Sequence, residues 1–204
     1  MNNTDTYYTI EKATEGYFKE KGSKFYSYAF PVYSEEDVKA RMSELKKKYF
    51  DAGHHCYAFR IGADHKFYRF SDDGEPSSTA GKPIFGQIQS KDLTNILIVV
   101  IRYFGGTKLG VSGLIASYRQ GAVEALETAK ILEKHVAKHY TLSFNYELMN
   151  DIMRIFKDEK IDPSKQDFQA TCKIDFSIRL NQADNVQSRF ENLHGCKIKL
   201  NFIA

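Results

Sequence analysis

The residues best suited to chemistry lie in a glycine-rich segment, residues 102–114, which reads RYFGGTKLGVSGL. A six-residue apolar run precedes it at 96–101, and apolar residues at helical spacing follow it at 114–129. A loop that leads from a buried strand into a helix leaves backbone N–H groups free at a positive helix end, which suits an anion. The candidate binding residues in this loop are Arg102, Gly105, Gly106, Lys108 and Gly110.

This loop departs from the known nucleotide-binding patterns. Gly105 and Gly110 have the spacing of a phosphate-binding P-loop, but Val111 and Ser112 follow where lysine and serine or threonine are needed. The glycine spacing of the dinucleotide fingerprint is missing as well. A tight turn that packs a strand against a helix remains the alternative, because glycine permits it without any ligand.

An acidic turn lies upstream, in the segment 70–83, which reads FSDDGEPSSTAGKP. Its carboxylates, Asp72, Asp73 and Glu75, could hold Mg²⁺ against a phosphate on the glycine loop. The same residues fit an ordinary turn in which glycine supplies a positive φ, and this interpretation needs no metal. Lys82 in this segment and Arg119 in the following helix complete the candidate cationic surface.

Other nucleophiles and bases are scattered along the chain. His54 and Cys56 are two residues apart, so they point to the same face of a strand. They could form a nucleophile–base pair or half of a metal site, but no third ligand follows at a workable spacing, which favours core packing or a local hydrogen bond. The hydroxyls at 77–79 have no histidine placed to activate them. The sequence therefore predicts no catalytic residue, no metal and no cofactor.

The elements that position these residues fall into two predicted domains, 1–132 and 136–204. In the first, the apolar strand at 95–103 lacks polar alternation and should be covered on both faces. A capping box at Ser34 and Asp37 opens one main helix, and the glycine loop opens the other. We expect a four-stranded sheet with these two main helices on one face. Strands are predicted at 7–11, 23–32, 54–62, 66–70 and 95–103.

The second domain has a regular plan of alternating strands and amphipathic helices. Apolar residues alternate with polar ones at 140–146, 172–180 and 198–202, and helical spacing appears at 148–156 and 186–193. A weaker strand near 161–165 contains Pro163 and belongs at a sheet edge. The order is strand, helix, strand, strand, helix, strand. This is the ferredoxin-like split βαβ plan, with one sheet face covered and the other open.

Composition excludes several classes of protein. The 204 residues are 27% charged and 42% hydrophobic, which excludes a disordered chain, and no apolar run is long enough to span a membrane. A net charge of +3 does not indicate an indiscriminate DNA binder. The three cysteines are widely spaced and predict neither disulfides nor a zinc site. No signal peptide is apparent, so we expect a cytoplasmic protein.

Four blocks of the sequence, in their order and spacing, resemble the IMPACT family, whose bacterial branch is YigZ-like. The blocks are 21–25, 54–60, 70–83 and 102–114, and the resemblance is close from about residue 15 to 130. Ser78 and Ser112 stand where the family pattern has glycine. The resemblance implies an N-terminal domain like the second domain of a small-subunit ribosomal protein. It also implies a small C-terminal domain like one in elongation factor G.

Residues and resemblance together predict a non-catalytic, translation-associated binding protein. Eukaryotic members of the family regulate translation through partners of a stress kinase. The partner expected here is RNA, the ribosome or a translation-linked protein, held at a surface that we call the glycine-loop surface. It consists of Lys82, Arg102, Gly105, Gly106, Lys108, Gly110 and Arg119.

The alternative is a small-molecule or phosphoryl-transfer enzyme. It would hold phosphate on the glycine loop, neutralise charge with Lys108 and bind Mg²⁺ at the acidic turn. Kinship of fold with small-molecule kinases supports it, but fold alone is a weak argument for function. The sequence predicts no oligomeric state.

Overall fold

The computed structural model describes residues 5–169 and 171–203 and divides them into two compact units. The first unit is Tyr7–Lys134. The second contains the chain from His135 onward, together with Asp5 and Thr6. Both units combine helices with antiparallel sheets, so the predicted α+β class with two parts is confirmed. No helix in the described ranges is long and apolar enough to cross a bilayer.

The first unit is built on a five-stranded sheet in the order β2-β3-β6-β4-β5, with all neighbours antiparallel. The predicted four-stranded sheet is therefore wrong in its strand number. The missed strand, β2, contains glutamate, glycine and lysine, which have low strand propensity, and it lies at a sheet edge. The strands are β2 (Thr14–Glu20), β3 (Ser23–Pro31), β4 (His54–Ile61), β5 (Phe67–Ser71) and β6 (Ile96–Tyr103).

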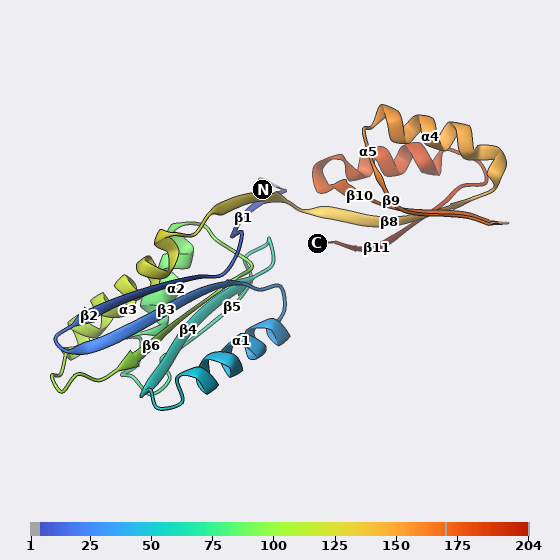
Figure 1. The fold of residues 1–204 in the computed structure, drawn as a ribbon. Coiled ribbons are helices and arrows are strands. Elements are labelled where there is room, and N and C mark those ends of the chain that lie inside the picture. Colours follow the sequence, from blue (N-terminus) through green and yellow to red (C-terminus); the bar gives the residue numbers. More distant parts are fainter. Residues whose placement is uncertain (1–4, 170, 204) are drawn as a thin grey trace. The chain divides into compact units, whose positions relative to one another are not determined.

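Helices cover both faces of this sheet (Figure 1). Helix α1 (Glu35–Lys48) packs on one face, whereas α2 (Gly81–Ser90) and α3 (Gly110–Glu127) pack on the other. The prediction that both main helices share one face is wrong. The central strand β6 is buried at almost every position, so alternate residues on it need apolar partners on opposite sides. Its predicted double cover is confirmed.

Local signals set the start of α1. The Ser34 hydroxyl accepts a hydrogen bond from the Asp37 N–H at 3.1 Å, and the Asp37 carboxylate accepts one from the Ser34 N–H at 3.0 Å. The capping box predicted from sequence is thus present. Outside the main sheet, β1 (Thr6–Ile10) and β7 (Ile131–His135) form a two-stranded sheet.

The second unit has a four-stranded antiparallel sheet in the order β11-β8-β10-β9. Strand β10 lies between β8 and β9, the two strands that the first helix connects. Both helices pack on one face, where they bury one apolar cluster, and polar side chains cover the other face. The elements occur in the predicted order: β8 (Ala137–Phe144), a short 3₁₀ helix (Tyr146–Leu148), α4 (Met149–Asp158), β9 (Pro163–Phe168), β10 (Cys172–Arg179), α5 (Leu180–Glu191) and β11 (Lys197–Ile203).

Asp5 belongs to the second unit because Arg179 binds it. The Arg179 Nε and Nη2 atoms donate to the two carboxylate oxygens at 2.6 and 3.0 Å. These hydrogen bonds hold the pKa of Asp5 below its ordinary value. An N-terminal residue thereby becomes part of a unit made mostly of C-terminal sequence.

Candidate functional site

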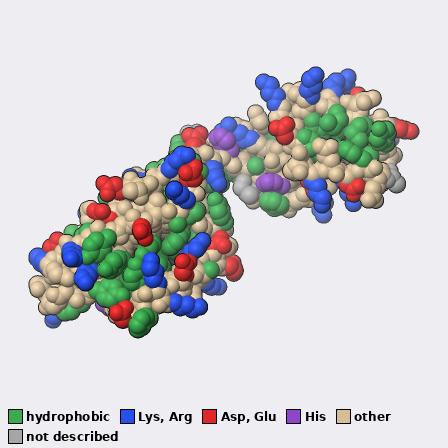
Figure 2. Space-filling view, viewed as in Figure 1, with side chains coloured by type: hydrophobic (Ala, Val, Ile, Leu, Met, Phe, Trp, Pro, Cys, Tyr) green, Lys and Arg blue, Asp and Glu red, His purple; other side chains and the backbone are tan. Residues whose placement is uncertain are grey.

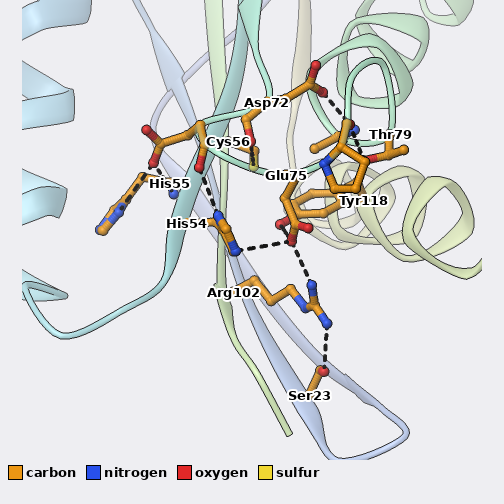
Figure 3. A network of polar contacts seen from close by, with 12 residues as sticks. Ser23, His54, His55, Cys56, Asp72, Glu75, Thr79, Arg102 and Tyr118 are labelled. Carbon is orange, nitrogen blue, oxygen red and sulfur yellow. Dashed lines mark hydrogen bonds and ion pairs between the residues drawn. The ribbon is translucent and has the colours of Figure 1, made fainter. Parts of the chain in front are cut away.

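The four sequence blocks meet at one end of the first unit's sheet (Figure 3). Arg102, near the end of β6, is paired in the sheet with Phe25 of β3 on one side and His54 of β4 on the other. The acidic turn that follows β5 brings Glu75 to the same place. Residues separated by about 80 positions in the sequence therefore form one cluster.

Glu75 is the centre of a buried polar network. Its Oε1 atom accepts hydrogen bonds from Arg102 Nη1 and from the Tyr118 hydroxyl, both at 2.7 Å. The side chains of Glu75 and Arg102 are only 4% and 7% exposed. A buried carboxylate is tolerated only when it is paired and hydrogen-bonded, and these two donors supply both requirements. Burial raises the pKa of Tyr118, so its hydroxyl stays protonated as a donor.

His54 and Ser23 complete the network. His54 Nδ1 lies 2.8 Å from the Asp73 carbonyl oxygen, which can only accept, so the Nδ1 atom carries the proton. Its other ring nitrogen faces Glu75 at 3.8 Å. The Ser23 hydroxyl lies 3.3 Å from both Arg102 Nη2 and the Gly105 N–H, which donate to it. Ser23 therefore links the β2–β3 hairpin to the glycine loop.

The acidic turn is held by internal hydrogen bonds. One oxygen of Asp72 accepts from the N–H groups of Ala80 and Gly81 at 2.9 and 2.8 Å, and the other accepts from Ser78 at 2.8 Å. Asp72 thus caps the start of α2. Asp73 accepts from the His55 N–H at 2.6 Å.

With Glu75 bound to Arg102, every carboxylate of the turn has a partner within the protein. The described residues contain no group of three histidine, cysteine or acidic side chains placed to hold a metal. The geometry agrees with the turn interpretation, in which Gly74 adopts a φ of +86°.

Replacing Asp72 with alanine should lower the free energy of unfolding by about 2 kcal/mol, because three backbone N–H groups lose their acceptor. Asparagine should recover part of this loss, since its amide oxygen can still accept. Urea unfolding measures both. Glu127→Ala, which removes an exposed carboxylate without a recorded partner among the described residues, is the matched control and should stay within about 0.5 kcal/mol. Stabilisation of the parent protein by Mg²⁺ that disappears in Asp72→Ala would contradict this assignment.

Cys56 is a buried thiol. Its Sγ donates to the Asp72 carbonyl oxygen at 3.0 Å, and burial raises the pKa of the thiol, which keeps it protonated. A thiol is a poor nucleophile in this form. The contact agrees with the local hydrogen bond expected from the sequence rather than with a nucleophile–base pair.

Two grooves flank the acidic turn. The smaller, with a volume of about 360 Å³, is bordered by Glu75, Pro76, Arg102, Phe104 and the 108–111 segment, and we call it the loop groove. The larger, of about 770 Å³, lies between α2 and α3, and we call it the helix groove. The one concave surface expected from sequence is therefore divided in two. Lys108 and Gly110 border the loop groove, Lys82 and Arg119 border the helix groove, and Gly105 and Gly106 border neither.

The three glycines of the surface have different roles. A Cβ on Gly105 would lie 1.9 Å from the carbonyl carbon of Gly22, so this glycine serves an internal contact with the hairpin. Gly106 and Gly110 have φ values of +87° and +74°, and a Cβ on either would meet nothing within 4 Å. Helix α3 begins at Gly110 without a side-chain cap, which leaves its first N–H groups beside Lys108 and the loop groove.

The cations differ in the same way. Lys82, Lys108 and Arg119 are exposed and have no recorded ion pair within residues 5–169 and 171–203. Arg102 is buried, and Glu75 compensates its charge. We therefore expect Arg102 to position the turn rather than to contact a partner. Figure 2 shows both signs of charge spread over the visible face of the first unit, with hydrophobic area between them.

Sequence reasoning missed the partners that organise the network. Ser23 and Tyr118 were identified only as parts of a block and of a helix core. A buried tyrosine needs a partner for its hydroxyl, and this requirement was the available signal. The identity of that partner, Glu75, depends on contacts between distant segments.

Comparisons with known proteins agree with the arrangement of the blocks. A family model described as the Impact N-terminal domain matches residues 21–126. The IMPACT family member YvyE of Bacillus subtilis is 32% identical over 147 residues, which are 72% of this chain and 68% of that protein. The IMPACT family member YigZ of Escherichia coli is 37% identical over 134 residues, 65% and 66% of the two chains. A crystal structure of a hypothetical protein superposes with a TM-score of 0.71 at 27% identity and covers 98% of both chains.

Proposed function

Because this chain belongs to the IMPACT family, we propose that it is a non-catalytic, translation-associated protein that binds RNA through the glycine-loop surface. The association with translation rests on the role of the eukaryotic members that the resemblance implies. The choice of RNA rests on the charges and backbone groups at the two grooves.

The observation that carries this proposal is the separation of the charges around the acidic turn. All three carboxylates accept hydrogen bonds from within the protein, and Lys82, Lys108 and Arg119 remain exposed without recorded ion pairs in the described ranges. The grooves therefore present uncompensated positive charge over a short distance. Phosphate groups are the ligands that such charges attract most strongly in RNA.

Lys108 is the key residue of the loop groove. It borders the groove together with the uncapped start of α3, where free N–H groups and the helix dipole favour an anion. Phe104, which is 60% exposed, offers a ring at the same groove. A phosphate on Lys108 with a base against this ring is the contact that these groups support.

The enzyme alternative receives no support from the acidic turn. Its carboxylates accept bonds from the backbone and from Arg102, and the buried thiol of Cys56 stays protonated. A phosphoryl-transfer mechanism would need these groups to leave their present partners.

A pull-down from cell lysate, with and without ribonuclease, tests the proposal. Parent protein and Lys39→Glu, which makes the same charge change on α1, should recover ribosomal or other RNA-containing material that ribonuclease removes. Lys108→Glu should recover at least about tenfold less, because charge reversal repels the phosphate that lysine binds. Equal recovery by Lys108→Glu would contradict the assigned surface. A single protein that survives ribonuclease would replace RNA with a protein partner.

A further inference from the structure

The second unit has a sheet face that no function assigned so far uses. In the antiparallel register, Ser143 of β8 lies between Lys173 of β10 and Lys197 of β11. Two residues along, Thr141 lies between Asp175 and Lys199. These side chains point away from the face on which α4 and α5 pack, because side chains alternate along a strand. We call this surface the open face.

Positive charge predominates on the open face. Lys165, Lys173, Lys197 and Lys199 are all exposed, and none has a recorded ion pair or hydrogen bond among the described residues. Two acids share the face, and one of them, Asp175, accepts a hydrogen bond from the Thr141 hydroxyl at 2.5 Å. Lysines without partners on a flat sheet suit the phosphates of an extended polyanion.

An aromatic pair stands at the edge of the same face. The rings of Phe202 and His139 are stacked, with centroids 4.2 Å apart and an interplanar angle of 17°. Phe202 is nevertheless 56% exposed. Its opposite neighbour in the register is His139 on the open face.

A bulge in β11 places Phe202 there. The register shifts between Leu200 and Phe202, so that Leu200 is opposite the core residue Tyr140 while Phe202, two positions on, is opposite His139. Strict alternation would have returned Phe202 to the helix-covered face. Bulges are a common means of redirecting one side chain at a binding site. This bulge presents an aromatic ring to solvent beside a row of lysines.

We propose that the open face binds single-stranded RNA. The lysines contact the phosphates, and an unstacked base packs on the Phe202–His139 pair, which is the combination that single-strand binding surfaces use. The hydroxyls of Ser143 and Ser177 lie on the same face without recorded partners in the described ranges, and they are placed to bond a 2′-hydroxyl. This site is independent of the glycine-loop surface.

Fluorescence anisotropy with the full chain and a labelled 12-nucleotide single-stranded RNA tests this proposal. Phe202→Ala should weaken binding roughly tenfold through lost stacking. Phe202→Leu keeps an apolar side chain and should weaken it as well, because leucine lacks the ring face. The double variant Lys173→Glu with Lys199→Glu should weaken binding at least about tenfold and lower the salt dependence by about one unit of log–log slope.

The control places the same charge change elsewhere in the second unit. Lys157→Glu with Lys160→Glu, in and directly after α4, should bind as the parent does. No binding by the parent, equal loss in this control, or equal affinity for duplex RNA would overturn the proposal. Weaker binding to DNA of the same sequence would support the role of the 2′-hydroxyl.

Lys108→Glu in the same assay separates the two proposals. Loss of binding in Lys108→Glu but not in the open-face variants would refute the open face and leave the glycine-loop surface standing. The reverse result would support the open face alone.

Discussion

Gly105→Ala should lower the free energy of unfolding of the first unit by about 3 kcal/mol or more. A Cβ at this position would lie 1.9 Å from the Gly22 carbonyl carbon and 2.1 Å from the Ser23 nitrogen. Both atoms are backbone, so no side-chain rotation relieves the overlap. The hairpin and the glycine loop would have to separate, which would also break the hydrogen bond from the Gly105 N–H to Ser23.

Gly106→Ala is the matched control for this prediction. It has a positive φ but no neighbour that a Cβ would meet, so only the backbone preference changes, at a cost of about 1–2 kcal/mol. Hydrogen exchange of the β6 amides measures the opening of the first unit without interference from the second. Equal protection in the two variants would show that the close contact with the hairpin is not required.

Arg102→Met should cost about 3–5 kcal/mol, because it leaves the Glu75 carboxylate buried without its counter-charge. Glu75→Gln should also destabilise, since it leaves the guanidinium buried with only a neutral acceptor. The double variant should lose less than the sum of the single losses, because neither charge is then left alone. The β6 amides again give the measurement.

The exposed pair of Arg41 and Glu44 provides the comparison. Both side chains are about half exposed or more, and Arg41→Ala should cost less than about 1 kcal/mol. If Arg102→Met cost no more than Arg41→Ala, the network around Glu75 would have no structural role. An unchanged fold with lost RNA recovery would then assign the arginine directly to binding.

Local patterns in the sequence predicted much of the fold. The capping box at Ser34, the apolar β6 strand and the order of elements after residue 135 depend on neighbouring residues, and the structure contains them. Strand β2 was missed because its residues are poor strand formers and its order comes from pairing with β3. The side on which each helix packs was also wrong, since it depends on how the chain crosses the sheet.

The candidate site was predicted in part. The cations Lys82, Lys108 and Arg119 were recognised from their positions around a loop, and the structure places them at two grooves. The different role of Arg102 could not be predicted, because its partner Glu75 is 27 residues away and reaches it only through the turn after β5. The need for glycine at position 105 likewise arises from a hairpin more than 80 residues earlier.

The bond between Asp5 and Arg179 has a consequence for the order in which the protein folds during synthesis. These residues are 174 positions apart, so Asp5 emerges from the ribosome long before its partner exists. The whole of Tyr7–Lys134 is synthesised in the meantime, and N-terminal parts of a chain generally fold first. The first unit can therefore be complete while Asp5 is still unpaired, and the start of the chain finds its place only when the last strands arrive.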